Sequence, residues 1–412
     1  MRSSRSPLVI LDDVRPIRWK SRFSAGPPAL PPLGECCDAR PGAGSESLTR
    51  ILWVCHKDPL NPQSGGVERV VHEVGCRLVA RGHEVTILSG GFPGAQSKVT
   101  LSGMKIIRRG RRVLPHLLLP MFIRENPEID LIIDDLGHAA PWFSPWLTGK
   151  PGFALFYHLH DRTLSGQVGP LLRAGLTTLE RLYPQIYRGW EFMTISRASM
   201  GDLIGLGVPP DQVRVVTLGV DMRLFHPVDK AREPQLVYFG GMRPYKRPEH
   251  SLLVLKGLIE RGVPARLVAV GVGPSTEAFV QAVADLDLSK SVEMAGRLVD
   301  SDLARVVGRS WLNLHFSRGE GFCLSALEAR AAGVPTVAYR NSSMAESVVD
   351  RVTGLLVPDN DPHAAVLASE RILREPSSWT DNCLAASAGW TWEDSVDTFE
   401  ETIMNTIDHI RR

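Results

Sequence analysis

The stretch Ser317-Arg-Gly-Glu-Gly-Phe-Cys-Leu-Ser-Ala-Leu-Glu-Ala-Arg-Ala-Ala-Gly-Val-Pro-Thr336 decides the fold of this chain. It follows the strand-like segment 312–316, so the predicted order is strand, glycine turn and helix. This order directs the free N–H groups of residues 321–324 at one point, where the helix dipole favours a phosphate anion. Glu320 in the turn and Glu328 two turns into the helix frame that point. Carboxylates accept hydrogen bonds from hydroxyl groups, so the pattern indicates a site for a sugar joined to a nucleoside diphosphate.

The size and composition indicate an ordinary globular protein. A length of 412 residues exceeds what one hydrophobic core usually supports, so we expect two domains of ~150 to 200 residues. Apolar residues make up 43 % of the chain and charged residues 22 %, which excludes a disordered or fibrous class. The formal net charge of +2 gives no sign of a general nucleic-acid binder.

The cysteines point to a reducing compartment. All six lack a Cys-x-x-Cys spacing and the density of a disulfide framework, so we expect reduced thiols and no metal site. No apolar run reaches the ~18 residues that would span a bilayer, and the N-terminus lacks the apolar stretch of a secretion signal. These features predict a cytoplasmic protein.

The first part of the chain predicts a parallel sheet. Residues 1–48 are rich in Pro, Gly, Ser and Arg and are expected to form a disordered tail, because such a composition buries little apolar surface. A strand at 51–55 follows, then a loop that ends in Gly65 and Gly66, a helix with one apolar face, and a strand at 84–88. Strand, turn, helix and strand make a βαβ unit, which implies parallel pairing.

The same alternation of strands and helices restarts after Pro227 and continues to Val357. We therefore predict an α/β protein with two doubly wound, Rossmann-like domains at residues 49–228 and 229–392. Ligands bind such sheets at the carboxyl ends of the strands, so the cleft between two facing domains is the expected site.

The segment from Glu320 to Glu328 resembles the E-x7-E signature of retaining glycosyltransferases of family 4, a nucleotide-sugar-dependent group with the GT-B fold. The similarity runs in the same order from about residue 50 to about residue 400. It implies a GT-B fold in which the first domain holds the acceptor and the second the nucleotide sugar. It also implies a last helix, residues 393–412, that packs back on the first domain.

The resemblance assigns roles to the two carboxylates: Glu320 would hold sugar hydroxyls and Glu328 the ribose. The donor-binding residues that it implies are Gly65, Gly66, Arg243, Gly271, Gly273, Gly321, Phe322, Cys323, Leu324 and Glu328. A tight turn that requires positive φ is the competing interpretation for Gly65 and Gly66. For the two glutamates the alternatives are a helix-start acid and a solvated helix face.

Lys246 resembles the lysine with which relatives clamp the donor diphosphate. When the chain is aligned on Gly240, however, the arginine that relatives place beside this lysine falls on Gly241. Arg243, two positions later, either supplies that guanidinium or leaves donor binding to Lys246 and the backbone amides.

His158 and His160 end an apolar strand and share one of its faces. The strand-end His-Asp of the family maps to His160 and Asp161, and in relatives the matching histidine supports the transition state beside the reacting sugar. His160, Lys246 and Glu320 are therefore the expected catalytic residues. A metal-binding pair, for which no third ligand is evident, and an ordinary core histidine are the alternatives for His160.

Two further acids match the family pattern. Glu68, in Gly-Gly-Val-Glu, either faces the acceptor or is a solvated helix acid. Glu346 fits the family, although Asn341 and the serines after it replace the usual glycines.

Together these parts imply transfer of a sugar from a nucleoside-diphosphate donor to an acceptor hydroxyl, with retained anomeric configuration and with neither a metal nor a cofactor. A sugar-nucleotide epimerase of the same fold and a non-catalytic nucleotide or glycan binder are the alternatives. Release of nucleoside diphosphate only when an acceptor is present would separate the three.

Residues 105–123 combine five basic residues with an apolar run. Such a segment could make peripheral contact with anionic lipid at the inner face of a membrane. A solvated loop that leads into a core helix is the competing interpretation.

Overall fold

The computed structural model describes residues 48–111, 114–164, 167–341 and 343–411, without the side chains of Arg162 and of residues 409–411. All of these residues belong to one compact unit. The predicted tail, apart from Leu48, lies outside the described residues. None of the described helices is long and apolar enough to cross a membrane.

The first sheet has eight strands in the order β3-β4-β2-β1-β5-β6-β7-β8, and every pair is parallel except β3 with β4. Its strands are β1 (Arg50–Val54), β2 (Glu84–Ser89), β3 (Lys98–Leu101), β4 (Met104–Arg108), β5 (Leu131–Asp135), β6 (Gly152–Phe156), β7 (Glu191–Thr194) and β8 (Val213–Val215). Every residue of β5 and β6 is buried, because helices cover both faces of a parallel sheet.

The second sheet has six strands, all parallel, in the order β11-β10-β9-β12-β13-β14. They are β9 (Gln235–Phe239), β10 (Arg266–Val270), β11 (Val292–Gly296), β12 (Leu312–His315), β13 (Thr336–Tyr339) and β14 (Gly354–Val357). The two parallel sheets confirm the predicted fold class of two doubly wound α/β domains. The predicted boundary between residues 228 and 229 falls between β8 and β9.

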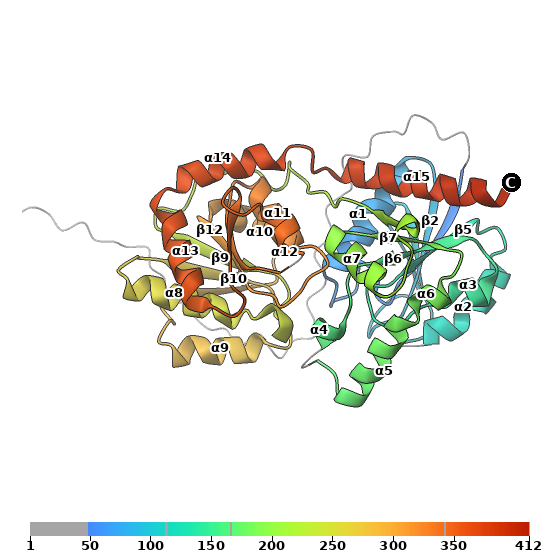
Figure 1. Cartoon of the computed structure of the whole chain (residues 1–412), viewed down its shortest axis with the longest axis horizontal. Helices are drawn as coiled ribbons and strands as arrows, with labels where there is room; N and C mark the ends of the chain where they lie inside the picture. The colour runs from blue at the N-terminus through green and yellow to red at the C-terminus, as the bar shows by residue number, and fades with distance from the viewer. Residues whose placement is uncertain (1–47, 112–113, 165–166, 342, 412) are drawn as a thin grey trace, which may run out of the picture. The chain divides into compact units, whose positions relative to one another are not determined.

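Helices alternate with the strands of both sheets (Figure 1). Those of the first sheet are α1 (Gly66–Ala80), α2 (Leu114–Glu125), α3 (Ser144–Thr148), α4 (Asp161–Leu164), α5 (Pro170–Arg181), α6 (Tyr183–Ile186) and α7 (Arg197–Gly205). Those of the second are α8 (Glu249–Glu260), α9 (Thr276–Asp285), α10 (Asp300–Arg309), α11 (Leu324–Ala331), α12 (Met344–Ser347), α13 (Pro362–Arg374) and α14 (Pro376–Ser387). Val70, Val74 and Leu78 of α1 are fully buried, so its apolar stripe faces the core as the spacing predicts.

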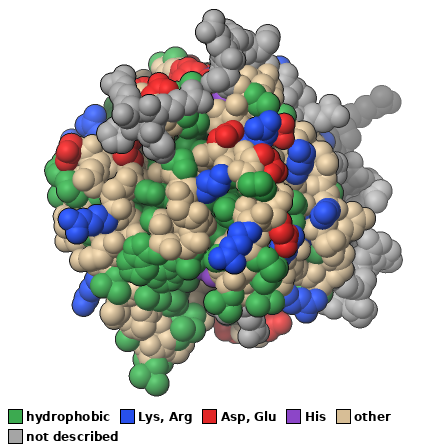
Figure 2. All heavy atoms as spheres, turned by 90° about the vertical axis from the view of Figure 1, so that its right-hand side faces the viewer, with side chains coloured by type: hydrophobic (Ala, Val, Ile, Leu, Met, Phe, Trp, Pro, Cys, Tyr) green, Lys and Arg blue, Asp and Glu red, His purple; other side chains and the backbone are tan. Residues whose placement is uncertain are grey.

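Exposed apolar side chains gather on three helices of the first sheet. Leu117 and Met121 of α2 are 74 % and 47 % exposed, and Trp146 of α3 is 62 % exposed. Leu171 and Leu172 of α5 are 90 % and 57 % exposed. Figure 2 views the molecule from the side on which α2 and α3 lie and shows hydrophobic side chains grouped there. We call these five residues the apolar face.

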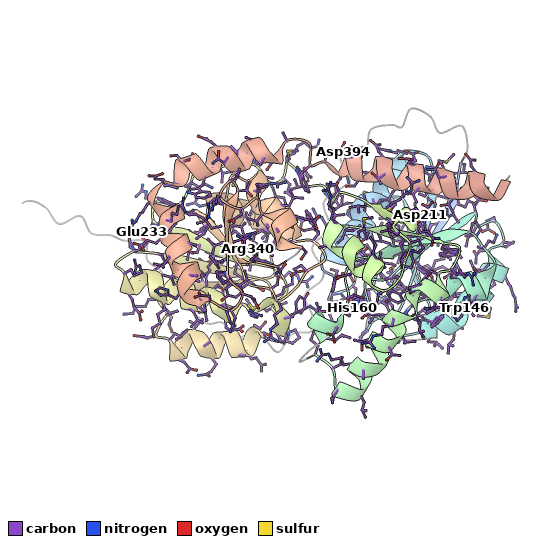
Figure 3. The ribbon with its side chains drawn as sticks, in the orientation of Figure 1. Trp146, His160, Asp211, Glu233, Arg340 and Asp394 are labelled. Carbon is purple, nitrogen blue, oxygen red and sulfur yellow. The ribbon has the colours of Figure 1, made fainter. Side chains whose placement is uncertain are left out.

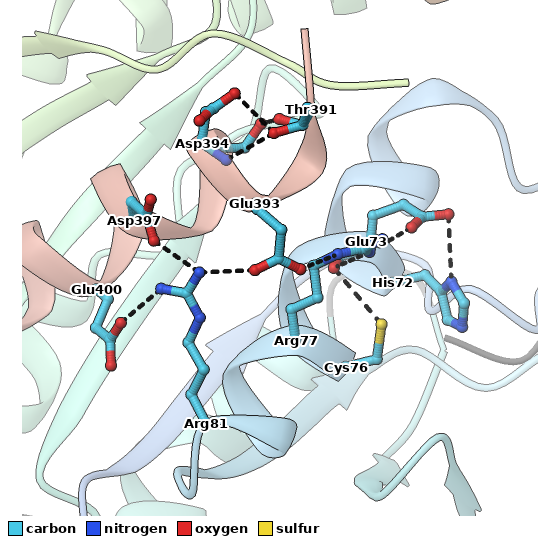
Figure 4. Close-up of polar contacts among 11 residues, drawn as sticks. His72, Glu73, Cys76, Arg77, Arg81, Thr391, Glu393, Asp394, Asp397 and Glu400 are labelled. Carbon is cyan, nitrogen blue, oxygen red and sulfur yellow. Dashed lines mark hydrogen bonds and ion pairs between the residues drawn. The ribbon is translucent and has the colours of Figure 1, made fainter. Parts of the chain in front are cut away.

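The last helix, α15 (Trp392–Arg411), packs on α1 and β6. Arg81, which follows the last residue of α1, forms ion pairs of 2.7 to 2.8 Å with Glu393, Asp397 and Glu400 (Figure 4). Asp394 lies at the start of the helix, where its carboxylate accepts a hydrogen bond from Thr391 (Figures 3 and 4). The Phe399 ring stacks on Trp53 of β1 at 5.7 Å. Charge pairing and apolar contact together hold the end of the chain on the first sheet.

Candidate functional site

The centre of the site is a charged trio at the carboxyl ends of two neighbouring strands. Lys246 lies in the short 3-10 helix Pro244–Lys246 after β9, and Glu320 lies in the turn after β12. Their Nζ and Oε1 atoms are 2.9 Å apart. His315, the last residue of β12, places Nε2 3.3 Å from the same carboxylate oxygen. Because β9 pairs with β12, the sheet itself brings these side chains together.

The protonation states of the trio follow from these contacts. Burial raises the pKa of Glu320, but Lys246 and His315 outweigh it and lower the pKa to about 2. Burial lowers the pKa of His315, but Cys323 and Glu320 raise it to about 9. Burial likewise opposes the charge of Lys246, but Glu320 raises its pKa above the usual range. At neutral pH the Lys246 ammonium and the His315 imidazole therefore flank an ionised Glu320, and the positive charge of His315 is favoured first by the neighbouring Cys323 thiolate.

The turn before α11 offers fewer free amides than the sequence predicts. The N–H group of Cys323 donates to Ser347 Oγ at 2.9 Å, so the prediction of four free N–H groups is wrong at this residue. The sequence could not reveal this bond, because Ser347 belongs to another helix. Within the described part of the chain, the N–H groups of Gly321, Phe322 and Leu324 have no acceptor.

Glu328 is the fifth residue of α11 and is half-buried. Burial raises its pKa to about 7, and Arg69 of α1 opposes that rise. The Arg69 guanidinium is itself held by Asp300 at 2.6 Å and by Glu73 at 2.8 Å. Because Glu328 is half-buried and burial raises its pKa, the alternative interpretation of a carboxylate on a solvated helix face does not fit.

Gly65 and Gly66 lie where α1 begins. Gly65 has a φ of −146°, and neither residue adopts positive φ, so the tight-turn interpretation is wrong. The Gly65 N–H donates to the carboxylate of Glu68 at 2.6 Å. A Cβ atom on Gly66 would lie 3.7 Å from the Leu324 side chain. The first turn of α1 therefore lies against the first turn of α11.

The Glu68 side chain is not exposed to solvent, and its carboxylate already accepts a hydrogen bond within its own helix start. It is 5 % exposed and caps its own helix through the Gly65 N–H, and burial raises its pKa. Glu346 has a similar capping role between domains, since its two oxygens accept the N–H groups of Arg197 and Ala198 at 2.8 Å, where α7 begins.

Arg243 lies beside Gly241. A Cβ atom on Gly241 would be 3.7 Å from Arg243 Nε, an ordinary contact distance, so the arginine side chain passes beside position 241. Its terminal nitrogen donates to Gln167 Oε1 at 3.2 Å. This placement favours the interpretation in which Arg243 supplies the guanidinium missing at position 241.

Gly271 and Gly273 have a packing role that the sequence did not show. A Cβ atom on Gly271 would lie 1.9 Å from the Gly240 carbonyl oxygen, and one on Gly273 would lie 2.2 Å from that of Met242. Gly271 also has a φ of +125°. Both glycines are required by the close approach of two loops, so their contact with a donor stays a prediction.

The two strand-end histidines occupy different environments. His160 is 7 % exposed, with Nδ1 2.7 Å from Glu180 Oε1 and Nε2 3.2 Å from the Gly137 carbonyl oxygen (Figure 3). His158 is half-buried and its ring lies 4.7 Å from that of His160. Burial and His160 lower the pKa of His158 to about 3, while the charges of Glu320 and Lys246 also act on it.

Sequence reasoning missed the structural partners of these groups. His315 lies near the end of the predicted strand 312–316, shortly before the glycine turn, and this position in the sequence could have marked it as a site residue. Glu180 and Arg69 gave no such signal, because each acts across the fold on a distant segment. Among the described residues, no group of three His, Cys, Asp or Glu side chains could hold a metal ion.

These observations define a class: an α/β protein with two Rossmann-like sheets, in which a lysine–glutamate–histidine trio lies at the carboxyl ends of β9 and β12. The description Glycosyltransferase Family 4 matches residues 64–224, and Glycosyl transferases group 1 matches residues 225–383. The chain belongs to this family of group 1 glycosyltransferases.

Curated relatives are similar to this chain in sequence, and a solved structure is similar to it in fold. The D-inositol 3-phosphate glycosyltransferase of Frankia alni is 33 % identical over 209 residues, which cover 46 % of this chain and 51 % of that protein. The match thus spans about half the length of that relative. A GDP-mannose-dependent alpha-(1-6)-phosphatidylinositol dimannoside mannosyltransferase of Mycobacterium tuberculosis is 26 % identical over 376 residues, 83 % of this chain and 93 % of that one. Sucrose-phosphate synthase from Thermosynechococcus elongatus shares the fold, with a TM-score of 0.74, 20 % identity and coverage of 88 % and 100 %.

Proposed function

We propose that this chain transfers a sugar from a nucleoside diphosphate to an acceptor hydroxyl, with retained anomeric configuration and without a metal. The observation that carries the proposal is the trio of Lys246, Glu320 and His315 beside the unpaired N–H groups at the start of α11. A departing diphosphate needs positive charge and N–H donors that are already in place, which is the largest catalytic term in such reactions.

In this reaction the bond between the anomeric carbon and the diphosphate oxygen breaks, and the acceptor oxygen bonds to the same carbon on the same face. The acceptor proton passes to a diphosphate oxygen, so no enzyme nucleophile is needed. Lys246 and Arg243 neutralise the leaving group. Glu320, fixed by Lys246 and His315 through Oε1, keeps Oε2 for a sugar hydroxyl.

His158 is the imidazole that we propose beside the reacting sugar. The prediction for His160 rests on the strand-end His-Asp alone, and both of its ring nitrogens have partners in the protein. The charges of Glu320 and Lys246 act on the pKa of His158, and the His158 ring lies 4.7 Å from the ring of His160. We therefore propose that His160, fixed by Glu180, positions His158 for that contact.

The test is a panel of nucleotide sugars, beginning with GDP-mannose, incubated with and without polyol and glycan acceptors. Release of nucleoside diphosphate that requires an acceptor, persists in EDTA and gives a product with the donor's anomeric configuration by NMR would support the proposal. Turnover of the nucleotide sugar without an acceptor would instead identify an epimerase. Binding without any turnover would identify a non-catalytic protein.

Donor binding is expected to strengthen as the pH rises through about 7. Glu328 must be ionised to accept both ribose hydroxyls, and burial places its pKa at about 7. A nucleotide sugar has no phosphate monoester that titrates in this range, and the pKa values of Glu320 and His315 lie at about 2 and about 9. The dissociation constant measured by calorimetry should fall about tenfold from pH 6 to pH 8, because the ionised fraction rises by that factor.

The Glu328→Gln variant should bind with one pH-independent, weaker affinity. A slope that survives in Glu328→Gln would assign the titration to another group and contradict the ribose role.

We also propose peripheral membrane contact, through the apolar half of the predicted segment 105–123 and not through its basic half. The basic half of that segment is largely neutralised: Arg108 is buried in a two-bond pair with Asp58, and Arg109 and Lys105 pair with Glu125 and Glu84. Arg112 lies outside the described residues. The apolar half remains, because Leu117 and Met121 belong to the apolar face with residues of α3 and α5.

The double variant Leu117→Ser, Met121→Ser should lose at least tenfold in sedimentation with vesicles that contain anionic phospholipid. Burial of each side chain in the lipid interface contributes roughly 1.5 kcal/mol or more. Leu367→Ser, an exposed leucine of α13, is the matched control and should bind like the wild type. Equal sedimentation of all three proteins would refute the membrane contact.

A further inference from the structure

Arg330, in the last turn of α11, is a buried cation with part of its guanidinium unpaired. The side chain is 2 % exposed. Its Nε and Nη2 atoms have no hydrogen-bond partner among the residues that the structure describes, and no ion pair of Arg330 forms within those ranges. A buried charge is usually paired, so the unpaired nitrogen atoms indicate a ligand that completes their contacts.

The two unpaired atoms belong to one edge of the guanidinium. The Nε–H and Nη2–H groups of an arginine point in the same direction and match the two oxygen atoms of a carboxylate or a phosphate. Arg108 uses this edge, since its Nε and Nη2 atoms donate to the two oxygens of Asp58 at 2.7 Å each. Arg247 leaves Nε unpaired, but both of its Nη atoms donate to Asp359. Arg330 thus presents a complete two-point donor that the described residues do not use.

The neighbours of Arg330 do not neutralise its charge. The Cζ atom lies over the Trp390 ring, 4.5 Å from its centre, a contact that stabilises the cation without accepting its N–H groups. Burial lowers the pKa of Arg330 to about 10, and Cys383 opposes that shift. Burial raises the pKa of Cys383 to about 12, so this thiol carries no charge at neutral pH. A water molecule would accept the N–H groups but would leave the buried cation without a counter-ion.

Trp390 connects this cation with the turn before α11. It lies between α14 and α15 and is half-buried, so part of its side chain reaches solvent near Arg330. Its ring also stacks on that of Phe322 at 5.8 Å, with an interplanar angle of 26°. Phe322 is one of the residues whose N–H groups are unpaired at the start of α11. One indole therefore contacts both the buried cation and the turn that would receive the donor.

We infer that the Nε–Nη2 edge of Arg330 binds a small oxyanion, a carboxylate or a phosphate, and that its occupancy strengthens nucleotide binding through Trp390 and Phe322. Two parallel N–H bonds to the oxyanion satisfy both unpaired nitrogen atoms, and its charge compensates the guanidinium. A guanidinium fixed in this way holds the indole against Phe322, which couples the two sites. The coupling rests on the proposed glycosyl transfer, whereas the oxyanion site does not.

Oxyanion binding can be tested without any nucleotide. Thermal unfolding of the full-length protein is measured while chloride is replaced by acetate or by phosphate at constant ionic strength. A ligand at 100 times its dissociation constant should raise the unfolding temperature by roughly 5 °C. A rise with both anions indicates a site for any two-oxygen group, and a rise with phosphate alone indicates a phosphate ligand. No rise with either anion would overturn the inference.

Variants of Arg330 exclude a general salt effect, because phosphate also stabilises proteins by exclusion from their surface. Arg330→Met keeps a long side chain beside Trp390 and should lose the rise. Arg305→Met alters a 67 % exposed arginine of α10 and should keep it. Arg330→Lys retains the charge without the two-point edge and should bind the oxyanion about tenfold more weakly than the wild type. An equal rise in the wild type and in Arg330→Met would refute the site.

Hydrogen exchange of the wild type locates the oxyanion even if the variants fold poorly. The oxyanion that stabilises the protein should slow exchange of the amides of residues 388–391, which lie beside the Arg330 edge. Protection confined to residues 321–324 would place the oxyanion at the donor turn and overturn the inference.

The coupling is measured with GDP and with UDP by calorimetry, in chloride and in the stabilising oxyanion. The wild type should bind nucleotide about fivefold more tightly in the oxyanion, and Arg330→Met should show no difference. Equal affinity in both solutions would contradict the coupling, as would weaker binding in the oxyanion for both proteins, the sign of competition at the donor turn. A protein that binds neither nucleotide would refute the donor site and the coupling, while the thermal shift still decides the oxyanion site.

Discussion

The Lys246→Ala variant is expected to lose about 10³-fold in kcat/KM, the largest effect on activity of any single change in the site. The ammonium, which follows β9, lies 2.9 Å from Glu320 Oε1 and next to the turn that would receive the diphosphate. Its removal takes away the charge that stabilises the leaving group and also frees the carboxylate that holds the sugar. Both effects lower kcat, so steady-state kinetics with a saturating donor should show the loss.

The same variant should be less stable by about 2 kcal/mol in urea unfolding, because the partly buried Glu320 carboxylate loses its ion-pair partner. Adding Glu320→Gln should restore most of this stability without restoring activity. Lys105→Ala, which removes an exposed lysine paired with Glu84, should change neither quantity. Activity within tenfold of the wild type in Lys246→Ala would remove Lys246 from the mechanism.

Gly271→Ala is expected to have the largest effect on stability, a loss of about 4 kcal/mol. The new methyl group would lie 1.9 Å from the Gly240 carbonyl oxygen, and the residue would have to hold a φ of +125°. Such overpacking costs about 1 to 3 kcal/mol and the unfavourable φ a further 1 to 3. Thermal unfolding of the second domain should shift down by roughly 10 °C.

Gly262→Ala separates the two causes in the same domain. Gly262 has a φ of +82°, but a Cβ atom there meets nothing within 4 Å, so its loss should be only about 1 kcal/mol. If Gly271→Ala were no worse than Gly262→Ala, the loop of residues 240–242 would have room that the structure does not show.

The order of strands and helices was readable from the sequence because it depends on local signals. Apolar runs bounded by glycine predict buried strands, and the spacing of Val70, Val74 and Leu78 predicts one helical face. The pairing of β9 with β12 then follows from the doubly wound topology, and it brings Lys246 to Glu320. Those two residues were found from sequence because a long motif and a strand end mark them.

The rest of the site depends on contacts between segments that no local pattern describes. The bond from the Cys323 N–H to Ser347 joins two helices, and the capping of α7 by Glu346 joins the two domains. The choice between His158 and His160 rests on Glu180, 20 residues away in α5. Likewise, the basic residues near position 108 looked free because their acidic partners lie in other elements.

The attachment of α15 to α1 has a consequence for synthesis on the ribosome. Arg81 and Trp53 emerge early, but the acidic and aromatic side chains that cover them belong to α15 and are made more than 300 residues later. The intervening sheet of residues 235–357 is continuous in sequence and has its own apolar core. The second domain can therefore complete its packing first, while the first domain keeps an uncovered flank until α15 has been made.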